Sequence, residues 1–307
     1  MREGDLRESI AEKSLSRSWR RTVSACVALT KPGLTAMSAG TAVAGGLLAA
    51  RGWQDAGTLA ALAVGTFLVG AGAIALNQYV ERAFDGLMRR TIRRPLQTGA
   101  LTPPQALWFG LSLEAIGLLV LAIFTNPLAT GLAALTVATY LLVYTPLKRR
   151  THLATAVGGF PGAIPPVIGW VAITGSVSIE AYILFLVLYL WQIPHSLALG
   201  WLYRVDYQRA GYRLLPSLDP SGKATGRVIF LFSLALLPAS VLPYIAGMAG
   251  IPFLVGILVA GIGFAVPAAR FARTVSDRKA RAVFIASLLY VPLFYGLMWA
   301  DQMTEYF

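Results

Sequence analysis

The chain has 307 residues, of which 56% are hydrophobic and only 13% are charged, and its formal net charge is +12. This composition excludes an ordinary water-soluble domain and a disordered chain, because most of such a sequence would be apolar surface in water. The lone cysteine, Cys26, excludes a disulfide framework and a cysteine-rich metal site.

Nine apolar stretches follow one another along the chain, each about long enough to cross a bilayer as a helix. Hydrocarbon offers no partner for backbone N–H and C=O groups, so such stretches must be helical, and the alternation of a β-barrel is absent. The predicted fold is therefore all-α, a polytopic membrane protein with nine transmembrane helices. The predicted spans are 33–50, 57–77, 107–124, 128–144, 155–173, 181–199, 228–246, 251–268 and 283–300.

The basic residues gather on one side of this predicted bundle. All 26 lysines and arginines except Arg51 fall in the N-terminal tail or in the loops after the second, fourth, sixth and eighth spans. By the positive-inside rule, this pattern predicts a protein of the cell inner membrane with its N-terminus in the cytoplasm and with Asp301 and Glu305 outside. Topology thereby explains the positive charge, and no nucleic-acid partner is expected.

One transmembrane domain, residues 33–300, is predicted, because no linker or soluble module separates the spans. Residues 1–32 form a predicted cytoplasmic tail. They mix basic and acidic side chains and contain no apolar segment of their own, unlike a cleaved signal or a transit peptide. Residues 301–307 form a predicted short external tail.

Three oxygen-bearing side chains, Asn77, Glu81 and Asp85, stand at intervals of four residues where the second span ends. On a helix each such step advances about 40° beyond a full turn, so the three side chains face one direction. An amide and two carboxylates on one face suit a hard cation such as Mg²⁺, which completes its shell with waters and substrate phosphates. The alternative is a structural role, in which acids at a helix end balance nearby arginines.

Basic residues accompany this triad. Arg90 and Arg94 follow it directly, and Lys148 and Arg149 end the fourth span. Because guanidinium and ammonium groups donate hydrogen bonds to diphosphate oxygens, the pattern predicts a site for a metal-diphosphate at the cytoplasmic ends of these helices.

A second polar loop, residues 203–227, occupies the same place after the sixth span as residues 81–104 do after the second, which indicates a weak internal duplication. Its Asp206 is predicted to reach the diphosphate from the opposite side of the bundle and to bind a second Mg²⁺. Asp219 lies in a Leu-Asp-Pro-Ser-Gly turn sequence, which favours a structural role.

Two titratable side chains lie within predicted spans. His195 is one of two histidines, and the residues alone leave both a packed histidine and a ligand open. Glu114 is a carboxylate deep in the third span, where an isolated charge costs at least about 2.5 kcal/mol. Either a functional role or a protonated carboxyl group facing the bundle interior is therefore expected. Pro165, Pro166 and Pro194 are expected to break helices around a cavity.

Five segments of the chain carry a family resemblance. They are residues 77–96, 144–151, 158–170, 191–195 and 206–216, and they include Asn-Gln-Tyr-Val-Glu-Arg-Ala-Phe-Asp, Tyr-Thr-Pro-Leu-Lys-Arg-Arg-Thr, Trp-Gln-Ile-Pro-His and Asp-Tyr-Gln-Arg-Ala-Gly. The first resembles the first aspartate-rich motif of the UbiA prenyltransferase superfamily, and the set is most similar to the haem-modifying branch. The resemblance extends from Leu29 to the last span.

The resemblance implies a nine-helix prenyltransferase bundle that transfers a farnesyl group from farnesyl diphosphate to the vinyl group of haem b, giving haem O for terminal oxidase biogenesis. It implies Mg²⁺ as cofactor, membrane lipids as surroundings, and a haem A synthase or the terminal oxidase assembly machinery as recipient of the product. The residues it implies are Asn77, Glu81, Asp85 and Asp206 as metal ligands, His195 at the haem, and Arg90, Arg94, Lys148, Arg149, Tyr144 and Tyr207 at the substrate.

Three positions depart from the family pattern. Glu81 stands where many members carry Asp, Ala210 stands where quinone-type relatives carry a second acidic residue, and Ile193 replaces a usual proline. Another UbiA-type prenyltransferase, acting on a quinone precursor or other aromatic acceptor, remains the nearest alternative. A membrane transporter is the alternative from a different class, since broken helices and buried acids occur there too.

Overall fold

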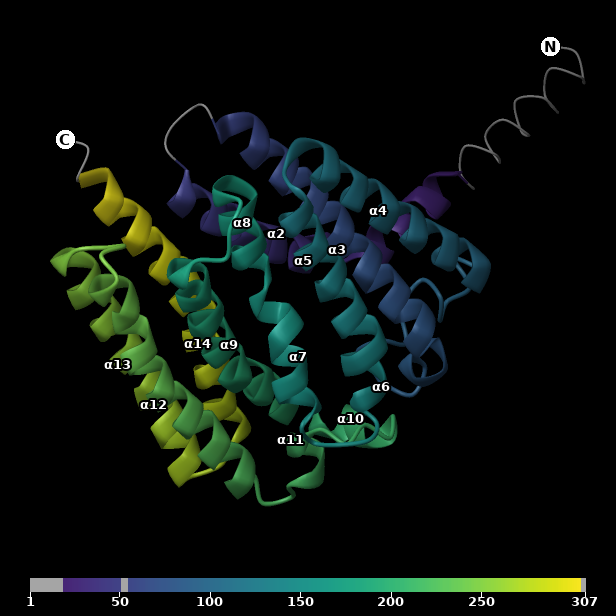
Figure 1. Ribbon diagram of the computed structural model, residues 1–307. Helices are drawn as coiled ribbons and strands as arrows, with labels where there is room; N and C mark the ends of the chain where they lie inside the picture. Colours follow the sequence, from purple (N-terminus) through teal and green to yellow (C-terminus); the bar gives the residue numbers. More distant parts are fainter. Residues whose placement is uncertain (1–18, 51–54, 305–307) are drawn as a thin grey trace, which may run out of the picture.

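A computed structural model describes residues 19–50 and 55–304, and these residues form a bundle of helices without a strand (Figure 1). Residues 19–30 are helical and precede α2. The first part of the bundle contains α2 (Pro32–Ala49), α3 (Ala56–Asp85), α4 (Pro103–Phe124), α5 (Pro127–Ala138), the π-helix η2 (Thr139–Tyr144), α6 (Thr145–Leu147), α7 (Ala154–Ala163) and α8 (Pro165–Thr174). The second part contains α9 (Ile179–Leu202), α10 (Arg204–Arg209), α11 (Leu215–Leu218), α12 (Lys223–Ile245), α13 (Ile251–Arg273) and α14 (Asp277–Thr304).

Eight helical segments in the described part of the chain are long and apolar enough to cross a membrane, and they match the second to ninth predicted spans. The prediction of an all-α polytopic membrane protein is confirmed. The first predicted span, residues 33–50, corresponds to α2, which has 18 residues, is rich in glycine and alanine, and falls outside those eight. It packs against α3 and α8 inside the same bundle.

The predicted boundaries shift at several helix ends. The second span was expected to end at Asn77, whereas α3 continues for two more turns to Asp85. The last helix, α14, continues beyond residue 300 to Thr304. Arg51 and Glu305 lie outside the described residues, and the division into tail, domain and tail stays a prediction.

Proline breaks one predicted helix and leaves another intact. The α7–α8 pair is interrupted before Pro165, as expected, because proline there begins a new helix. The break expected at Pro194 is wrong, since α9 runs without interruption from Ile179 to Leu202. Proline removes only one backbone hydrogen bond, and the packing of the buried Ile193 and Pro194 holds this segment helical.

Glycines allow close approach where helices cross. A Cβ atom on Gly45 of α2 would overlap the carbonyl oxygen of Pro166 on α8, and one on Gly169 of α8 would overlap that of Ala42 on α2. Because a methyl group has no room at these points, the two glycines set the contact distance between the helices.

One end of the bundle carries a cap made from three loops. α6, α10 and α11 lie together there, at the bottom of the view (Figure 1). The backbone N–H of Arg213 donates to the carbonyl oxygen of Lys148 at 2.8 Å, which joins the loop after α10 to the end of α6. A buried cluster ties both to the loop after α3, and its buried members are Met88, Ala154, Ala210, Tyr212 and Leu214.

Asp301 in the last turn of α14 is buried beside the start of α13. Its carboxylate accepts hydrogen bonds from the backbone N–H groups of Gly250 and Phe253, the second at 3.4 Å. The neighbouring Gln302 amide donates to the carbonyl oxygen of Leu48 at the end of α2, at 3.4 Å. The final turn therefore caps one helix and contacts another.

Candidate active site

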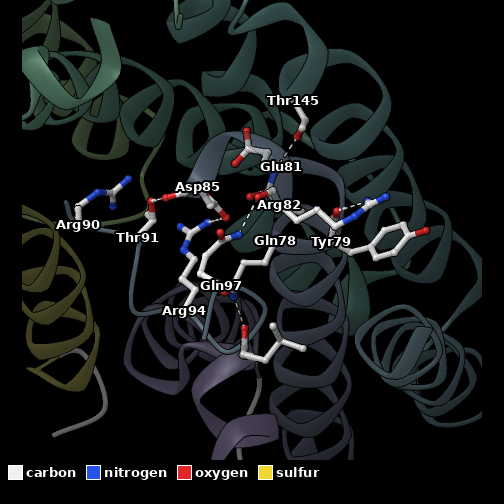
Figure 2. A network of polar contacts seen from close by, with 12 residues as sticks. Gln78, Tyr79, Glu81, Arg82, Asp85, Arg90, Thr91, Arg94, Gln97 and Thr145 are labelled. Atoms are coloured by element: carbon white, nitrogen blue, oxygen red, sulfur yellow. Dashed lines mark hydrogen bonds and ion pairs between the residues drawn. The ribbon is translucent and has the colours of Figure 1, made fainter. Parts of the chain in front are cut away.

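The last turns of α3 bury the three side chains of the predicted metal site. Asn77, Glu81 and Asp85 are exposed to 6%, 6% and 1%, respectively. Tyr79 and Arg82, on the other side of the helix, point away from Glu81 and Asp85, and the Arg82 guanidinium lies over the Tyr79 ring (Figure 2). Two carboxylates and an amide are thus placed on the interior face of one helix.

Asn77 is held by the π-helical turn of the neighbouring helix. Its side-chain amide donates to the Thr145 hydroxyl at 3.0 Å, and that hydroxyl donates to the carbonyl oxygen of Tyr140 at 2.8 Å. The wider turn of η2 lies between Tyr140 and Thr145 and sets the position of both. Single π-helical turns inside α-helices often occur at functional sites.

Glu81 forms an ion pair with Lys148, with 2.6 Å between the glutamate oxygen and the lysine nitrogen. The Lys148 ammonium lies 4.7 Å from the ring centre of Tyr144 and 5.7 Å from that of Tyr212. Both charged side chains are almost fully buried, so the pair is shielded from solvent. Tyr212 is a site residue that the sequence reasoning did not single out, although it lies within the segment 206–216 that carries the family resemblance.

Asp85 forms an ion pair with Arg94 through one carboxylate oxygen. The loop after α3 folds back to make this contact: the Thr91 hydroxyl donates to the Asp85 carbonyl oxygen at 2.6 Å, and the Gln97 amide donates to that of Arg82 at 2.7 Å (Figure 2). The other carboxylate oxygen of Asp85, Oδ1, is buried and has no hydrogen-bond partner among the described residues. A buried acceptor without a partner is unfavourable unless a ligand completes it.

Lys31, which no site prediction included, faces the same charges. It adopts a left-handed backbone, with φ of 47°, at the junction before α2. Burial is the main reason why its pKa is lowered to about 8, and the charges of Arg94 and Arg90 act in the same direction. Asp85 and Glu81 oppose this shift, so their carboxylates also lie near the ammonium group.

The junction that carries Lys31 is fixed to α3. The Gln78 side-chain amide donates to the carbonyl oxygen of Leu29 at 2.5 Å, and the Thr35 hydroxyl donates to that of Thr30 at 2.7 Å. The signal in the sequence was the proline after Lys31, because the residue before a proline rarely continues a helix.

Asp206 lies in α10, buried against the loop after α3. Its carboxylate accepts from the backbone N–H of Arg90 at 3.3 Å and lies 3.9 Å from the Arg209 guanidinium. The Arg90 guanidinium in turn is 3.5 Å from the Tyr207 hydroxyl and lies over the Tyr203 ring. The two polar loops therefore meet, as expected.

The structure does not join Asp206 to the α3 acids. Within residues 19–50 and 55–304, no three His, Cys, Asp or Glu side chains are placed to hold a metal ion together. Asp206 contacts the arginines of the loop instead of completing such a set. Its role as a metal ligand stays a prediction.

Arg149 is exposed, unlike Arg94 and Lys148, and its guanidinium packs over the Phe84 ring at 3.8 Å. It borders a pocket of about 430 Å³ beside Glu81. The residues lining this pocket are Val80, Glu81, Phe84, Thr145, Pro146, Arg149, Arg150 and Tyr212.

His195 belongs to a separate cluster between α9 and α14. The Nδ1 atom is 2.8 Å from the Ser287 hydroxyl oxygen. The imidazole ring stacks on Trp191 with 4.9 Å between ring centres and packs on Phe284 at 5.0 Å. His152, by contrast, is exposed. The structure gives His195 a defined place but no contact with the α3 acids.

The remaining acids have distinct surroundings. Glu114 is buried between α3 and α4, with its side chain against Gly72, and neither carboxylate oxygen has a hydrogen-bond partner in the described chain.

Asp219 accepts hydrogen bonds from the backbone N–H and hydroxyl of Thr225 at 2.8 and 3.0 Å, and so caps the start of α12. The structural role expected for Asp219 is confirmed.

The site combines hard oxygen ligands with several cations. Asp85 Oδ1 is a buried oxygen without a partner, and Glu81 and Asn77 supply further oxygens on the same face. Such residues fit Mg²⁺, which needs only one or two protein carboxylates when phosphate oxygens complete its shell. Lys31 and Arg94 add the positive charge that a diphosphate requires.

The chain matches known proteins over most of its length. The model of the UbiA prenyltransferase family matches residues 38–289. A "Protoheme IX farnesyltransferase" of Solibacter usitatus is 42% identical over 285 residues, covering 90% of this chain and 98% of the relative. A protein of the same name from Ralstonia nicotianae is 38% identical over 289 residues, with 94% of each chain covered.

Solved structures share the fold. One, of a UbiA homologue from Aeropyrum pernix, has a TM-score of 0.71 and 20% identity over 89% of this chain and 98% of that one. Another, of a UbiA homologue from Archaeoglobus fulgidus bound to GPP and Mg²⁺, has a TM-score of 0.64 and 15% identity over 89% of this chain and 99% of that one. At these identities, the likeness establishes the arrangement of the helices.

Proposed function

Because this chain belongs to the UbiA prenyltransferase family, we propose that it is an integral membrane enzyme that transfers a farnesyl group from farnesyl diphosphate to the vinyl group of haem b, giving haem O. One observation carries this proposal. The relatives named "Protoheme IX farnesyltransferase" match 78–95% of this chain at 36–43% identity.

The diphosphate head binds at the buried C-terminal ends of α3 and α6. Arg94, Lys148 and Lys31 surround the two carboxylates there, and each can donate to phosphate oxygens. Arg90 extends the positive surface toward Tyr207, and Arg149 extends it across the pocket beside Glu81. The farnesyl tail, being apolar, lies between the helices, and both substrates reach the site laterally from the membrane.

Binding replaces one set of charge pairs by another. In the structure, Arg94 pairs with Asp85 and Lys148 pairs with Glu81. Asn77, Glu81 and Asp85 would hold Mg²⁺, and Arg94 and Lys148 would then donate to phosphate oxygens instead of the carboxylates. Bound Mg²⁺ neutralises charge on the leaving group. Asp206 would bind a second ion only by giving up the hydrogen bond from the Arg90 backbone N–H.

The reaction begins when the bond between the allylic carbon and the diphosphate oxygen breaks, with both electrons going to the oxygen. Arg94, Lys148 and Lys31 stabilise the negative charge that develops there. The vinyl π electrons of haem b then form the new carbon–carbon bond. Water adds to the cation that results next to the porphyrin, and a proton is released.

His195 contacts the haem in this proposal, either as a ligand of the iron or as a group that orients the porphyrin. Its ring is half-buried in α9, between two aromatic side chains. The basic loops support a diphosphate site on the cytoplasmic side of the membrane, with the chain's N-terminus on that side and its C-terminus outside. A haem A synthase or the terminal oxidase assembly machinery then takes up haem O.

The test is the mass of the product. Purified protein in lipid nanodiscs is incubated with haem b, farnesyl diphosphate and Mg²⁺, with 4-hydroxybenzoate offered as a competing acceptor. We expect a haem that carries a hydroxyethylfarnesyl group and no prenylated benzoate. Prenylation of the benzoate alone establishes the quinone-type alternative, and solute movement in vesicles without any prenylated product establishes a transporter.

A further inference from the structure

Three side chains enclose the imidazole of His195, and we call them together with it the histidine clamp. Trp191 precedes His195 on α9, while Phe284 and Ser287 lie on α14. The Trp191 and Phe284 rings pack on the imidazole with interplanar angles of 26° and 33°. Because aromatic rings and Ser287 hold it, the imidazole cannot turn freely, and the atoms at its edge have fixed directions.

The hydroxyl of Ser287 is what decides where the imidazole proton lies. Ser287 Oγ is 2.6 Å from the carbonyl oxygen of Phe284. A carbonyl oxygen carries no hydrogen, so two oxygens at this distance require the single hydroxyl hydrogen between them. The hydroxyl then has only lone pairs left for His195 Nδ1, 2.8 Å away. Nδ1 must therefore carry the hydrogen and donate it.

This arrangement leaves the other ring nitrogen of His195 as an acceptor. In a neutral imidazole one nitrogen is protonated and the other has a free lone pair. With Nδ1 protonated, the lone pair is on Nε2, and the hydrogen bond of Nδ1 to Ser287 is the one that the ring makes within the described part of the chain. A protein histidine binds a metal in this form, with its second nitrogen donating to a fixed acceptor.

Ser287 is itself firmly held. Its side chain is fully buried, at 0% exposure, so no water replaces the hydroxyl if it is removed. The indole N–H of Trp191 donates to the carbonyl oxygen of Ser287 at 2.7 Å. One residue of α14 thus contacts both the histidine and the aromatic ring that stacks on it, which aligns α9 with α14 at this point.

We propose that Ser287 is a positioning residue, which holds His195 with its proton on Nδ1 so that Nε2 is presented to the iron of a porphyrin substrate. The proposal rests on the proposed function for the identity of that substrate. It adds a residue on a helix 92 positions away in sequence from the histidine it positions.

The tautomer can be measured directly, because the chain has only two histidines. In a His152→Gln background, the ¹⁵N signals of labelled protein report His195 alone. We expect a protonated Nδ1 and an unprotonated Nε2 in this background, and a mixture of tautomers after Ser287→Ala. A protonated Nε2 before the serine is changed overturns the proposal, and so does an unchanged tautomer after Ser287→Ala.

The effect on ligand binding is measured by titrating the full-length protein with ferric protohaem and following its absorption spectrum. We expect Ser287→Ala to weaken binding by about 10- to 100-fold, as loss of a partner of a metal-binding histidine does. Ser240→Ala is the matched control, since Ser240 is also a buried helical serine that bonds a ring-bearing residue, Tyr290, and it should leave binding unchanged.

A double variant separates positioning from a general loss of structure. If Ser287 acts through His195, Ser287→Ala has no further effect in a His195→Ala protein. An equal loss in both backgrounds overturns the proposal. The mass of the reaction product is measured on the same wild-type preparation. If the tautomer and the protohaem binding are as expected but no farnesylated haem forms, Ser287 is still a positioning residue, and only the proposed farnesyl transfer is rejected.

Discussion

Lys148 and Glu81 are 67 positions apart in sequence, yet their charged groups form an ion pair at 2.6 Å in a nearly dry environment. The pair joins α3 to the end of α6, and the neighbouring pair of Arg94 and Asp85 ties the loop after α3 to the same place. Removing one partner of such a buried pair leaves an uncompensated charge, which costs about 3–5 kcal/mol. Substitutions of these four residues must therefore be chosen so that a loss of stability can be told apart from a loss of catalysis.

Glu81→Gln is expected to abolish turnover and to leave a folded protein. The amide keeps an oxygen that accepts from Lys148, but it lacks the negative charge that holds a metal ion. Product formation and the apparent melting temperature in detergent are both measured. Adding Lys148→Gln should restore any lost stability without restoring turnover; normal activity of Glu81→Gln would contradict the metal assignment.

Asp85→Asn is expected to lower turnover by at least about 100-fold, because the free Oδ1 oxygen loses its charge. The control is Asp277→Asn, since Asp277 also pairs with an arginine, Arg204, but is exposed and lies on α14. Rates are measured over a range of Mg²⁺ concentrations. If both variants lose activity equally, the loss reflects general charge and not a metal ligand.

Lys31 predicts a pH dependence. Burial lowers the pKa of Lys31 to about 8, so without substrate its side chain is charged below pH 8 and neutral above. A bound diphosphate favours the charged form, so binding takes up a proton and weakens as the pH rises through 8 to 9. The KM for farnesyl diphosphate should therefore increase in this range.

Lys31→Arg supplies the comparison, because a guanidinium keeps its charge at every pH in this range. Its KM should stay flat between pH 7 and 9, whereas Lys31→Met should raise the KM at every pH. An identical pH profile for wild type and Lys31→Arg would show that another group is responsible.

His195→Ala is expected to abolish the use of haem while farnesyl diphosphate still binds. The histidine lies in the α9–α14 cluster and has no contact with the α3 acids, so the two substrates should be affected separately. Binding of each substrate is titrated on its own. His152→Ala, which changes an exposed histidine, should leave both affinities as they are.

Gly45→Ala is expected to destabilise the bundle by about 1–3 kcal/mol, because the new methyl group meets the backbone of Pro166 and cannot be accommodated without a shift. Gly40→Ala, in the same helix, places its methyl group in open space and should be neutral or slightly stabilising. Thermal unfolding in one detergent compares the two. Equal stability would mean that α2 and α8 can separate freely.

The sequence predicts the membrane bundle and the α3 triad well, because both depend on local periodicity. Apolar stretches must be helical in a bilayer, and a spacing of four must bring Asn77, Glu81 and Asp85 to one face. The charged residues of the other loops on the same side of the bundle extend this to Lys148 and Asp206. The contacts of Lys148 and Asp206 depend on how separate loops fold back onto the helices, and no local sequence pattern describes that folding.

Lys31, Tyr212 and Ser287 illustrate what sequence reasoning misses. In the sequence, Lys31 looks like one more basic residue of the N-terminal tail. In the structure, its left-handed backbone conformation brings it to the site. Nothing in the sequence singles out Tyr212 within its loop, and Ser287 looks like one small residue in an apolar helix. Each gains its role from a contact with a residue far along the chain. The expected break at Pro194 fails for the same reason, since packing from other helices outweighs local preference.

The capping of α13 by Asp301 has a consequence for biosynthesis. The carboxylate that completes the first turn of α13 comes from a residue made 51 positions after Gly250, at the end of the last helix. During translation α13 thus emerges without this carboxylate, and its first turn stays uncapped until α14 has been made. The bundle reaches its final form only when this turn of α14 closes onto α13 and α2, which are made before it.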